Sequence, residues 1–362
     1  MRKDIPVLTS FRFFAALAVV IYHYEYQKRA VFPLWASSFG FEAVSFFFVL
    51  SGFILTYAHA RSPQSIDLKI EVEGRTFLAR RAGRILPAYI LGLAIAAPFF
   101  VYGTFYSKII PLSLFLTGLI LVPFLAQAWY PPAASLWNLP AWSLSVESFF
   151  YVLFPILART VNLLRPVPLL LLSLVFVAVL EQLRRSIPTL LENHFTKGNL
   201  EAFAGFFPPF HLPQFVLGIA VARIFLLRRP LTLPTSETLL AFSLALVSIV
   251  VYAKPQYSAM SSPTILSTVF ALLIYAGASA SGVLSALFSG RTLVLLGEAS
   301  YVMYILHIPI TLWWGSTVAR YLTLTPQQDF AAYFAVVIVA SLISLQWIEK
   351  PARALIVSRF GR

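Results

Sequence analysis

Residues 11–24 read FRFFAALAVVIYHY and lie within the first apolar run of the chain, residues 7–26. The run has about the 20 residues that a membrane-spanning helix needs, yet it contains Arg12 and His23. These two positions are close to three helical turns apart, so a helix presents both side chains on one face, about 17 Å apart along its axis. The stretch therefore predicts a membrane helix that carries a cation and an imidazole on the same face.

The same face carries small residues between the two polar ones: Ala15, Ala16 and Val19. An arginine inside a membrane span costs about 2.5–3.5 kcal/mol on insertion scales, which favours a functional role. In the alternative interpretation, Arg12 extends its charge to the membrane interface and His23 is an interfacial polar residue. The helix alone leaves both interpretations open.

The composition of the whole chain is that of a polytopic membrane protein. Of 362 residues, 59% are hydrophobic and 11% charged, and the mean hydropathy is +0.82. We therefore expect a single membrane domain over residues 1–362, without an appended soluble domain. Basic cytoplasmic loops explain the net charge of +13 better than nucleic-acid binding does. The chain has no cysteine and its five histidines include no i,i+4 pair, so no metal site is predicted.

The distribution of apolar runs predicts an all-α, polytopic transmembrane helical bundle. If every run crosses the membrane, the loop lysines and arginines, Arg2 and Lys3 among them, divide evenly between the two sides. If either 109–127 or 142–158 fails to cross, they concentrate on the side of the termini. Because cytoplasmic loops are the basic ones, we expect about ten crossings, cytoplasmic termini, and one re-entrant or interfacial segment. Pro111 and Pro123 favour 109–127 as that segment, with 142–158 as the alternative. The runs are 7–26, 39–60, 85–103, 109–127, 142–158, 167–181, 209–227, 236–253, 262–287, 293–318 and 329–348.

A basic cluster precedes the third run, in the segment RTFLARRAGRILPAYI, residues 75–90. Arg81 and Arg84 are spaced i,i+3, and Arg80 and Arg84 are spaced i,i+4, so one helical turn presents all three guanidinium groups. The planar guanidinium fork suits phosphate groups. The alternative is plain anchoring to anionic lipid at the cytoplasmic face.

Two further runs carry polar side chains. In WSLSVESFFYVLFP, residues 142–155, the Glu147 carboxylate is expensive unless it is paired or faces a polar cavity, and Trp142 and Ser143 lie in the turn before it. No Gly-x-Ser-x-Gly elbow is present, which argues against a serine nucleophile. Near the end of the chain, Ser300, Tyr304 and His307 form a polar stripe on one helical face, which favours a cavity lining. A buried, hydrogen-bonded structural histidine is the alternative for that position.

Taken in this order, these segments resemble acyltransferase family 3, a family of integral membrane acyltransferases. The resemblance covers nearly the whole chain and rests on five motifs in sequence. Two departures stand out: Phe11 replaces the usual leucine, and the usual Gly-Val-Asp is Ala43-Val44-Ser45. Many relatives also carry an appended extracytoplasmic hydrolase-like domain. The matching residues are Arg12, Ala15 and His23; FFVLSGF at 47–53; Arg81, Arg84, Ile85 and Pro87; WSLSVESFFY at 142–151; and Ser300, Tyr301, Tyr304 and His307.

The resemblance implies transfer of an acyl group, usually acetyl, from cytoplasmic acyl-CoA to a sugar hydroxyl at the outer face of a bacterial inner membrane. It implies no permanently bound cofactor, a functional histidine at His23, and paired arginines at Arg81 and Arg84. An imidazole with a pKa near about 6.5 can remove the proton of the acceptor. We expect Arg12 to help seat the CoA. We expect Glu147 to be a catalytic residue beside His23, which orients a polar partner or a protonated group.

Arg12 and His23 lie about 17 Å apart along the first helix, so the acyl group of the donor has to reach from one end of the helix to the other. We expect the pantetheine arm to lie along Ala15, Ala16 and Val19, and we expect Trp142, Ser143, Ser300, Tyr301, Tyr304 and His307 to line the cavity. His307 is the competing candidate for the base. The expected partners are acyl-CoA, a carbohydrate acceptor and membrane lipid, with polysaccharide biosynthesis machinery as a further candidate.

Two other classes of protein remain open. A small-solute transporter also places charges within helices, although no pair of half-chains with matching broken helices is visible. A non-catalytic subunit of a polysaccharide export complex is the third alternative.

Overall fold

The computed structural model describes residues 4–26, 31–61, 69–192, 196–228, 230–257 and 262–360. Arg2 and Lys3, which enter the count of loop charges, lie outside these ranges. The described chain is almost entirely helical, and its strands β1 (Ala60–Arg61) and β2 (Lys69–Ile70) form one short antiparallel pair. The predicted all-α class is confirmed. The α-helices are α1 (Pro6–Tyr26), α2 (Leu34–Ser37), α3 (Gly40–His59), α4 (Gly74–Phe105), α5 (Leu112–Leu121), α6 (Trp142–Val161), α7 (Pro166–Leu191), α8 (Lys197–Phe206), α9 (Leu212–Leu227), α10 (Leu233–Ala253), α11 (Pro263–Ser279), α12 (Val283–Phe288), α13 (Arg291–Ser316), α14 (Val318–Tyr321), α15 (Pro326–Ser344) and α16 (Lys350–Phe360).

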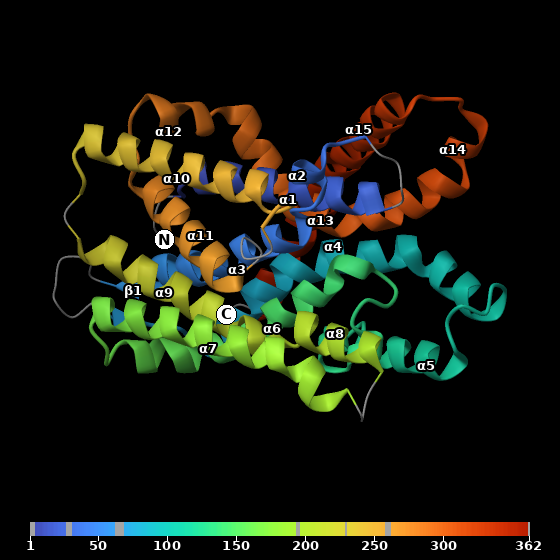
Figure 1. Cartoon of the computed structure of the whole chain (residues 1–362), viewed down its shortest axis with the longest axis horizontal. Helices are drawn as coiled ribbons and strands as arrows, with labels where there is room; N and C mark the ends of the chain where they lie inside the picture. The colour runs from blue at the N-terminus through green and yellow to red at the C-terminus, as the bar shows by residue number, and fades with distance from the viewer. Residues whose placement is uncertain are drawn as a thin grey trace.

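The long helices lie side by side, roughly along the longest axis of the molecule (Figure 1). Within the described ranges, nine helical segments are long and apolar enough to cross a membrane. Helix α11, with 17 residues, stands at the short end of the spanning range, and counting it gives the predicted ten. Helix α5 has only 10 residues, about 15 Å of helix against a hydrocarbon core of about 30 Å. The chain is therefore a multi-pass bundle in which α5 is too short to cross.

The segment that follows α5, residues 122–141, is irregular and is attached to α4 and α13 by hydrogen bonds. Its carbonyl oxygen at Val122 accepts a 2.5 Å hydrogen bond from the Tyr89 hydroxyl. The Gln127 amide donates to the carbonyl of Ala141 at 2.8 Å. The Asn138 amide donates at 3.0 Å to the carbonyl of Ile305 in α13. Irregular backbone is tolerated in a membrane protein where protein groups satisfy it, so α5 and this segment are compatible with the expected re-entrant or interfacial element.

Two close helix crossings fix the helices at the centre of the bundle. Gly297 of α13 lies so near α1 that an added Cβ would overlap the carbonyl of Thr9. Gly52 of α3 meets α9 in the same way, at the carbonyl oxygen of Phe215. Small residues allow such approach between membrane helices. As a result, α1 packs directly against α3 and α13, the helices that carry much of the site described below.

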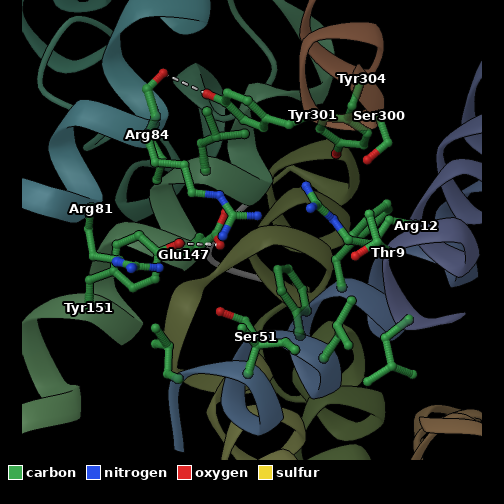
Figure 2. Close-up of a pocket in the computed structure, with 18 of the residues that line it drawn as sticks. Thr9, Arg12, Ser51, Arg81, Arg84, Glu147, Tyr151, Ser300, Tyr301 and Tyr304 are labelled. Carbon is green, nitrogen blue, oxygen red and sulfur yellow. Dashed lines mark hydrogen bonds between the residues drawn. The ribbon is translucent and has the colours of Figure 1, made fainter. Parts of the chain in front are cut away.

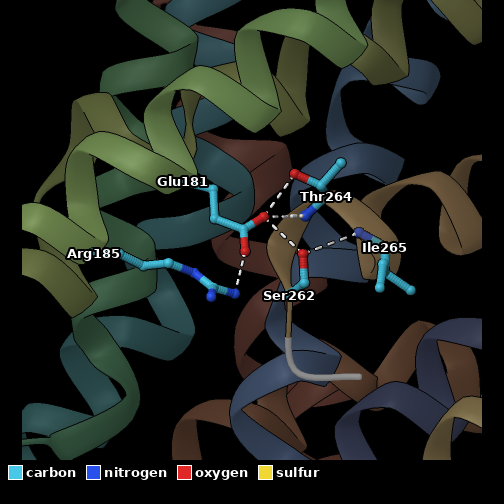
Figure 3. Close-up of polar contacts among 5 residues, drawn as sticks. All are labelled: Glu181, Arg185, Ser262, Thr264 and Ile265. Carbon is cyan, nitrogen blue, oxygen red and sulfur yellow. Dashed lines mark hydrogen bonds and ion pairs between the residues drawn. The ribbon is translucent and has the colours of Figure 1, made fainter. Parts of the chain in front are cut away.

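A buried carboxylate ties α7 to α11 farther from this centre (Figure 3). Glu181 of α7 accepts hydrogen bonds from the Ser262 hydroxyl at 2.7 Å and from the Thr264 hydroxyl at 2.6 Å. It also accepts from the Thr264 backbone N–H at 3.1 Å and from Arg185 at 2.5 Å. The carboxylate therefore caps the first turn of α11, and this network is a helix junction with its acceptors satisfied.

Candidate functional site

A cavity of about 310 Å³ lies at the centre of the bundle, between α1, α3, α4, α6, α13 and α16. Its walls are apolar where α3 contributes side chains such as Phe47, Leu50 and Ile54. The other helices contribute polar side chains that converge on the interior (Figure 2). A concave apolar chamber with a few convergent polar groups is the usual form of a small-molecule site.

Three arginines from two helices meet in this cavity. Arg12 comes from α1, while Arg81 and Arg84 come from one turn of α4. Figure 2 shows Arg12 and Arg84 reaching into the cavity from opposite sides. No carboxylate of a described residue forms an ion pair with any of the three. Positive charges gathered without paired anions leave their donor groups available to an anionic ligand.

Aromatic rings hold Arg81 in place. Its guanidinium carbon lies 5.6 Å from the ring centre of Phe77 and 5.9 Å from that of Tyr151, which is cation–π distance. Its Nε is buried without a hydrogen-bond partner among the described residues. The side chain is therefore oriented by rings, and its Nε–H is left to donate to another group.

Glu147 faces the same cavity. This agrees with the expectation that a carboxylate within an apolar run is paired or faces a polar cavity. One of its carboxylate oxygens accepts a 2.5 Å hydrogen bond from the Tyr151 hydroxyl, one turn along α6. Figure 2 shows the carboxylate beside the arginines of α4. On the opposite wall, the Tyr301 hydroxyl donates to the carbonyl of Ile85 at 2.7 Å and joins α13 to α4. The carboxylate thus has a fixed orientation within a positively charged site.

Two hydroxyl groups and one carbonyl group form a cluster where α13 lines the cavity. The hydroxyls of Tyr304 and Ser143 are 2.7 Å apart, and each lies 3.0 Å from the carbonyl oxygen of Pro140. Two hydroxyl protons cannot fill three contacts at once, so the hydrogen bonds can exchange within the cluster. Both hydroxyls line the cavity, and either could turn its proton toward a ligand oxygen.

His307 lies one helical turn beyond Tyr304 and is wholly buried. Its Nε2 is 3.0 Å from Nδ1 of His23, and its Nδ1 is 2.8 Å from the carbonyl oxygen of Tyr304. Neither histidine lines the cavity itself. The two residues that the sequence offered as competing bases are therefore one hydrogen-bonded pair, contributed by α1 and α13.

Several predicted site residues lie elsewhere. Arg80 is exposed and is outside the cavity lining. Trp142 is buried against aromatic rings of α3 and α8. Ala16 and Val19 are buried in packed clusters and Ala15 is half-buried, and none of these three lines the cavity. The small-residue face between Arg12 and His23 is therefore covered by protein in this structure.

Two features of the cavity were not predicted from the sequence: the apolar wall formed by α3, and a further arginine. Arg353 of α16 lines the cavity, although none of the sequence motifs includes it. Nearby, Glu349 ends a π-helical turn, Leu345–Glu349, and is buried. A one-turn π-helix has no sequence signature, and π-turns often occur at functional sites. In the sequence, the only sign of this part of the site was Glu349, a carboxylate directly after the last apolar run.

Comparison with known proteins finds similarity to acyltransferases. A family model described as an acyltransferase domain matches residues 6–345. Acyltransferase MdmB of Streptomyces mycarofaciens is 29% identical over 326 residues, covering 84% of this chain and 79% of its own length. O-acetyltransferase OatA of Staphylococcus aureus is 25% identical over 375 residues, covering 97% of this chain and 57% of its own length. Peptidoglycan O-acetyltransferase OatA of Listeria monocytogenes is 27% identical over 166 residues, 42% of this chain and 24% of its own length. No solved structure matches significantly.

Proposed function

The chain belongs to the acyltransferase family whose domain matches residues 6–345, and we propose that it moves an acetyl group from acyl-CoA to a carbohydrate hydroxyl. In this proposal the protein lies in the bacterial inner membrane with both termini in the cytoplasm. The donor enters from the cytoplasm, and the acceptor is a polysaccharide or glycolipid at the outer face. The name of the Listeria relative, a peptidoglycan O-acetyltransferase, supports a carbohydrate acceptor.

The main support for acyl-CoA as the donor is that the arginines of the cavity form no ion pairs with described residues. The nucleotide end of CoA bears a 3′-phosphate and a pyrophosphate, and Arg12, Arg81 and Arg84 present guanidinium groups that form no ion pair with a described carboxylate. Bidentate guanidinium–phosphate contacts are among the stronger hydrogen-bonded pairs. Arg80, which is exposed, has the position of a lipid anchor in this proposal.

The cavity also suggests a path for the thioester. A volume of about 310 Å³ suits the pantetheine arm, with the phosphates of the nucleotide end bound by the arginines. The arm then passes Ile85 and Tyr301 and brings the thioester carbonyl toward Tyr304 and Ser143. This path replaces the one expected along the alanines of α1, because those residues are covered. A hydroxyl of Tyr304 or Ser143 that turns toward the carbonyl oxygen stabilises the negative charge that develops there.

The chemistry then requires one base. His23 takes the proton from the acceptor hydroxyl as the hydroxyl oxygen attacks the thioester carbon. The new carbon–oxygen bond forms, the carbon–sulfur bond breaks, and the proton passes from His23 to the CoA thiolate. Glu147 balances the charge of the arginines and holds Tyr151, and it takes no proton in this scheme.

Turnover of the donor by the purified protein tests this function against both alternatives. Detergent-purified protein is mixed with acetyl-CoA and a sugar acceptor, and free CoA and acetylated sugar are measured by mass spectrometry. The proposal expects equal amounts of both products, lost in His23→Ala. A transporter or a non-catalytic subunit would leave acetyl-CoA intact at every acceptor concentration.

A further inference from the structure

We infer that His307 is a positioning residue, which holds His23 in the tautomer whose Nε2 is free to accept a proton. The pair is formed by a 3.0 Å contact between Nε2 of His307 and Nδ1 of His23. The tautomer follows from the structure alone. Its consequence for catalysis rests on the proposed function.

The direction of the hydrogen bonds is set at the Tyr304 carbonyl. A carbonyl oxygen can only accept, so Nδ1 of His307, 2.8 Å away, carries the hydrogen. His307 is wholly buried, and a buried charge without a partner anion is costly, so the ring is neutral. A neutral imidazole with hydrogen on Nδ1 has a lone pair on Nε2. Nδ1 of His23 must therefore donate to it, which leaves Nε2 of His23 as an acceptor.

The surroundings of His307 keep its ring in that place. Its backbone carbonyl lies 2.8 Å from the Thr311 hydroxyl and 3.1 Å from the Tyr333 hydroxyl, which comes from α15. These two hydroxyls are 2.8 Å from each other. The turn of α13 that carries His307 is thus fixed to a second helix. His23, in contrast, is only half-buried.

The arrangement also suits the charged state that the reaction creates. When Nε2 of His23 takes the acceptor proton, both nitrogens of that ring carry hydrogen. The bond from Nδ1 to His307 then becomes a charge-assisted one, which is stronger. His307 orients and stabilises the imidazolium as a carboxylate does in a Ser-His-Asp triad, without placing a second charge inside the membrane.

The tautomer can be measured directly on the intact protein. In protein labelled with ¹⁵N-histidine, two-bond ¹H–¹⁵N spectra distinguish hydrogen on Nδ1 from hydrogen on Nε2, and a His23→Gln sample assigns the His23 signal. We expect hydrogen on Nδ1 of His23 in the wild type. Hydrogen on Nε2 in the wild type would overturn the inference, whatever the activity of the protein.

Matched variants test the catalytic consequence. His307→Gln places an amide oxygen that can still accept from His23, whereas His307→Leu removes the acceptor and keeps an apolar side chain. We expect His307→Leu to lower kcat by about 10²-fold or more with little change in KM for acetyl-CoA, and His307→Gln to recover at least about tenfold of that loss. Equal kcat values for two variants with the same thermal midpoint would overturn the inference. Wild-type protein that transfers nothing would count against the proposed function, and the spectra would still decide the tautomer.

Discussion

Arg84 provides the sharpest test of the donor site, because Arg80 on the same helix is a matched control. Arg84 lines the cavity and Arg80 is exposed outside it, yet both carry the same charge within about one turn. A hydrogen bond to a charged group contributes about 1.5–3 kcal/mol. Since no described carboxylate pairs with Arg84, no ion pair within the protein has to break on binding. Arg84→Met should therefore raise the Kd for CoA by about 10–150-fold.

The lysine variant separates charge from geometry. Arg84→Lys keeps the positive charge and loses the bidentate fork, so we expect a smaller rise in Kd, about 5–10-fold. Arg80→Met should leave the Kd within about twofold, because Arg80 lies outside the cavity lining and solvent screens its exposed charge. Isothermal titration of CoA into detergent-purified protein measures the Kd of all three variants. Equal effects of Arg80→Met and Arg84→Met, or no effect of either, would make these arginines lipid anchors.

Two further variants test the chemistry and the fold. Tyr304→Phe should lower kcat by about 10²-fold because it removes a hydroxyl that can stabilise the developing oxyanion, while the Kd for CoA stays unchanged; an unaltered kcat would exclude that role. Gly52→Ala should destabilise the protein by about 1–3 kcal/mol, because the added Cβ overlaps the backbone carbonyl of Phe215. Gly74→Ala, where an added Cβ meets nothing within 4 Å, is its control, and equal thermal midpoints for the two variants would contradict the packing argument.

Local regularity explains which features the sequence could predict. Helical spacing placed Arg81 and Arg84 on one turn, and the membrane cost of a carboxylate placed Glu147 against a polar cavity. All three residues line the cavity that the structure shows. Loop charges and two prolines predicted that the run 109–127 does not cross the membrane. The helix in that run, α5, has only 10 residues, which is too short to span. Each of these inferences needs only the neighbours of a residue in the chain.

Contacts between distant helices could not be predicted in this way. His23 and His307 are separated by 284 positions, and nothing in either segment shows that their rings meet. The same limit applies to the covered face at Ala16, since helical spacing shows which residues share a face but not which helix packs on it. Arg353 was missed for a related reason: a π-helical turn precedes its helix, and a basic helix end is common in membrane proteins.

Sided transfer across a sealed membrane tests the central claim most directly. The protein is reconstituted into liposomes with a sugar acceptor trapped inside, and labelled acetyl-CoA is added only outside, with protein-free liposomes and His23→Ala as controls. Molecules whose cytoplasmic face points outward should place labelled acetyl groups on the trapped sugar, release CoA outside, and admit no acetyl-CoA to the lumen. Intact acetyl-CoA in the lumen, or transfer only when donor and acceptor share one side, would contradict passage of the acyl group through the arginine-lined cavity.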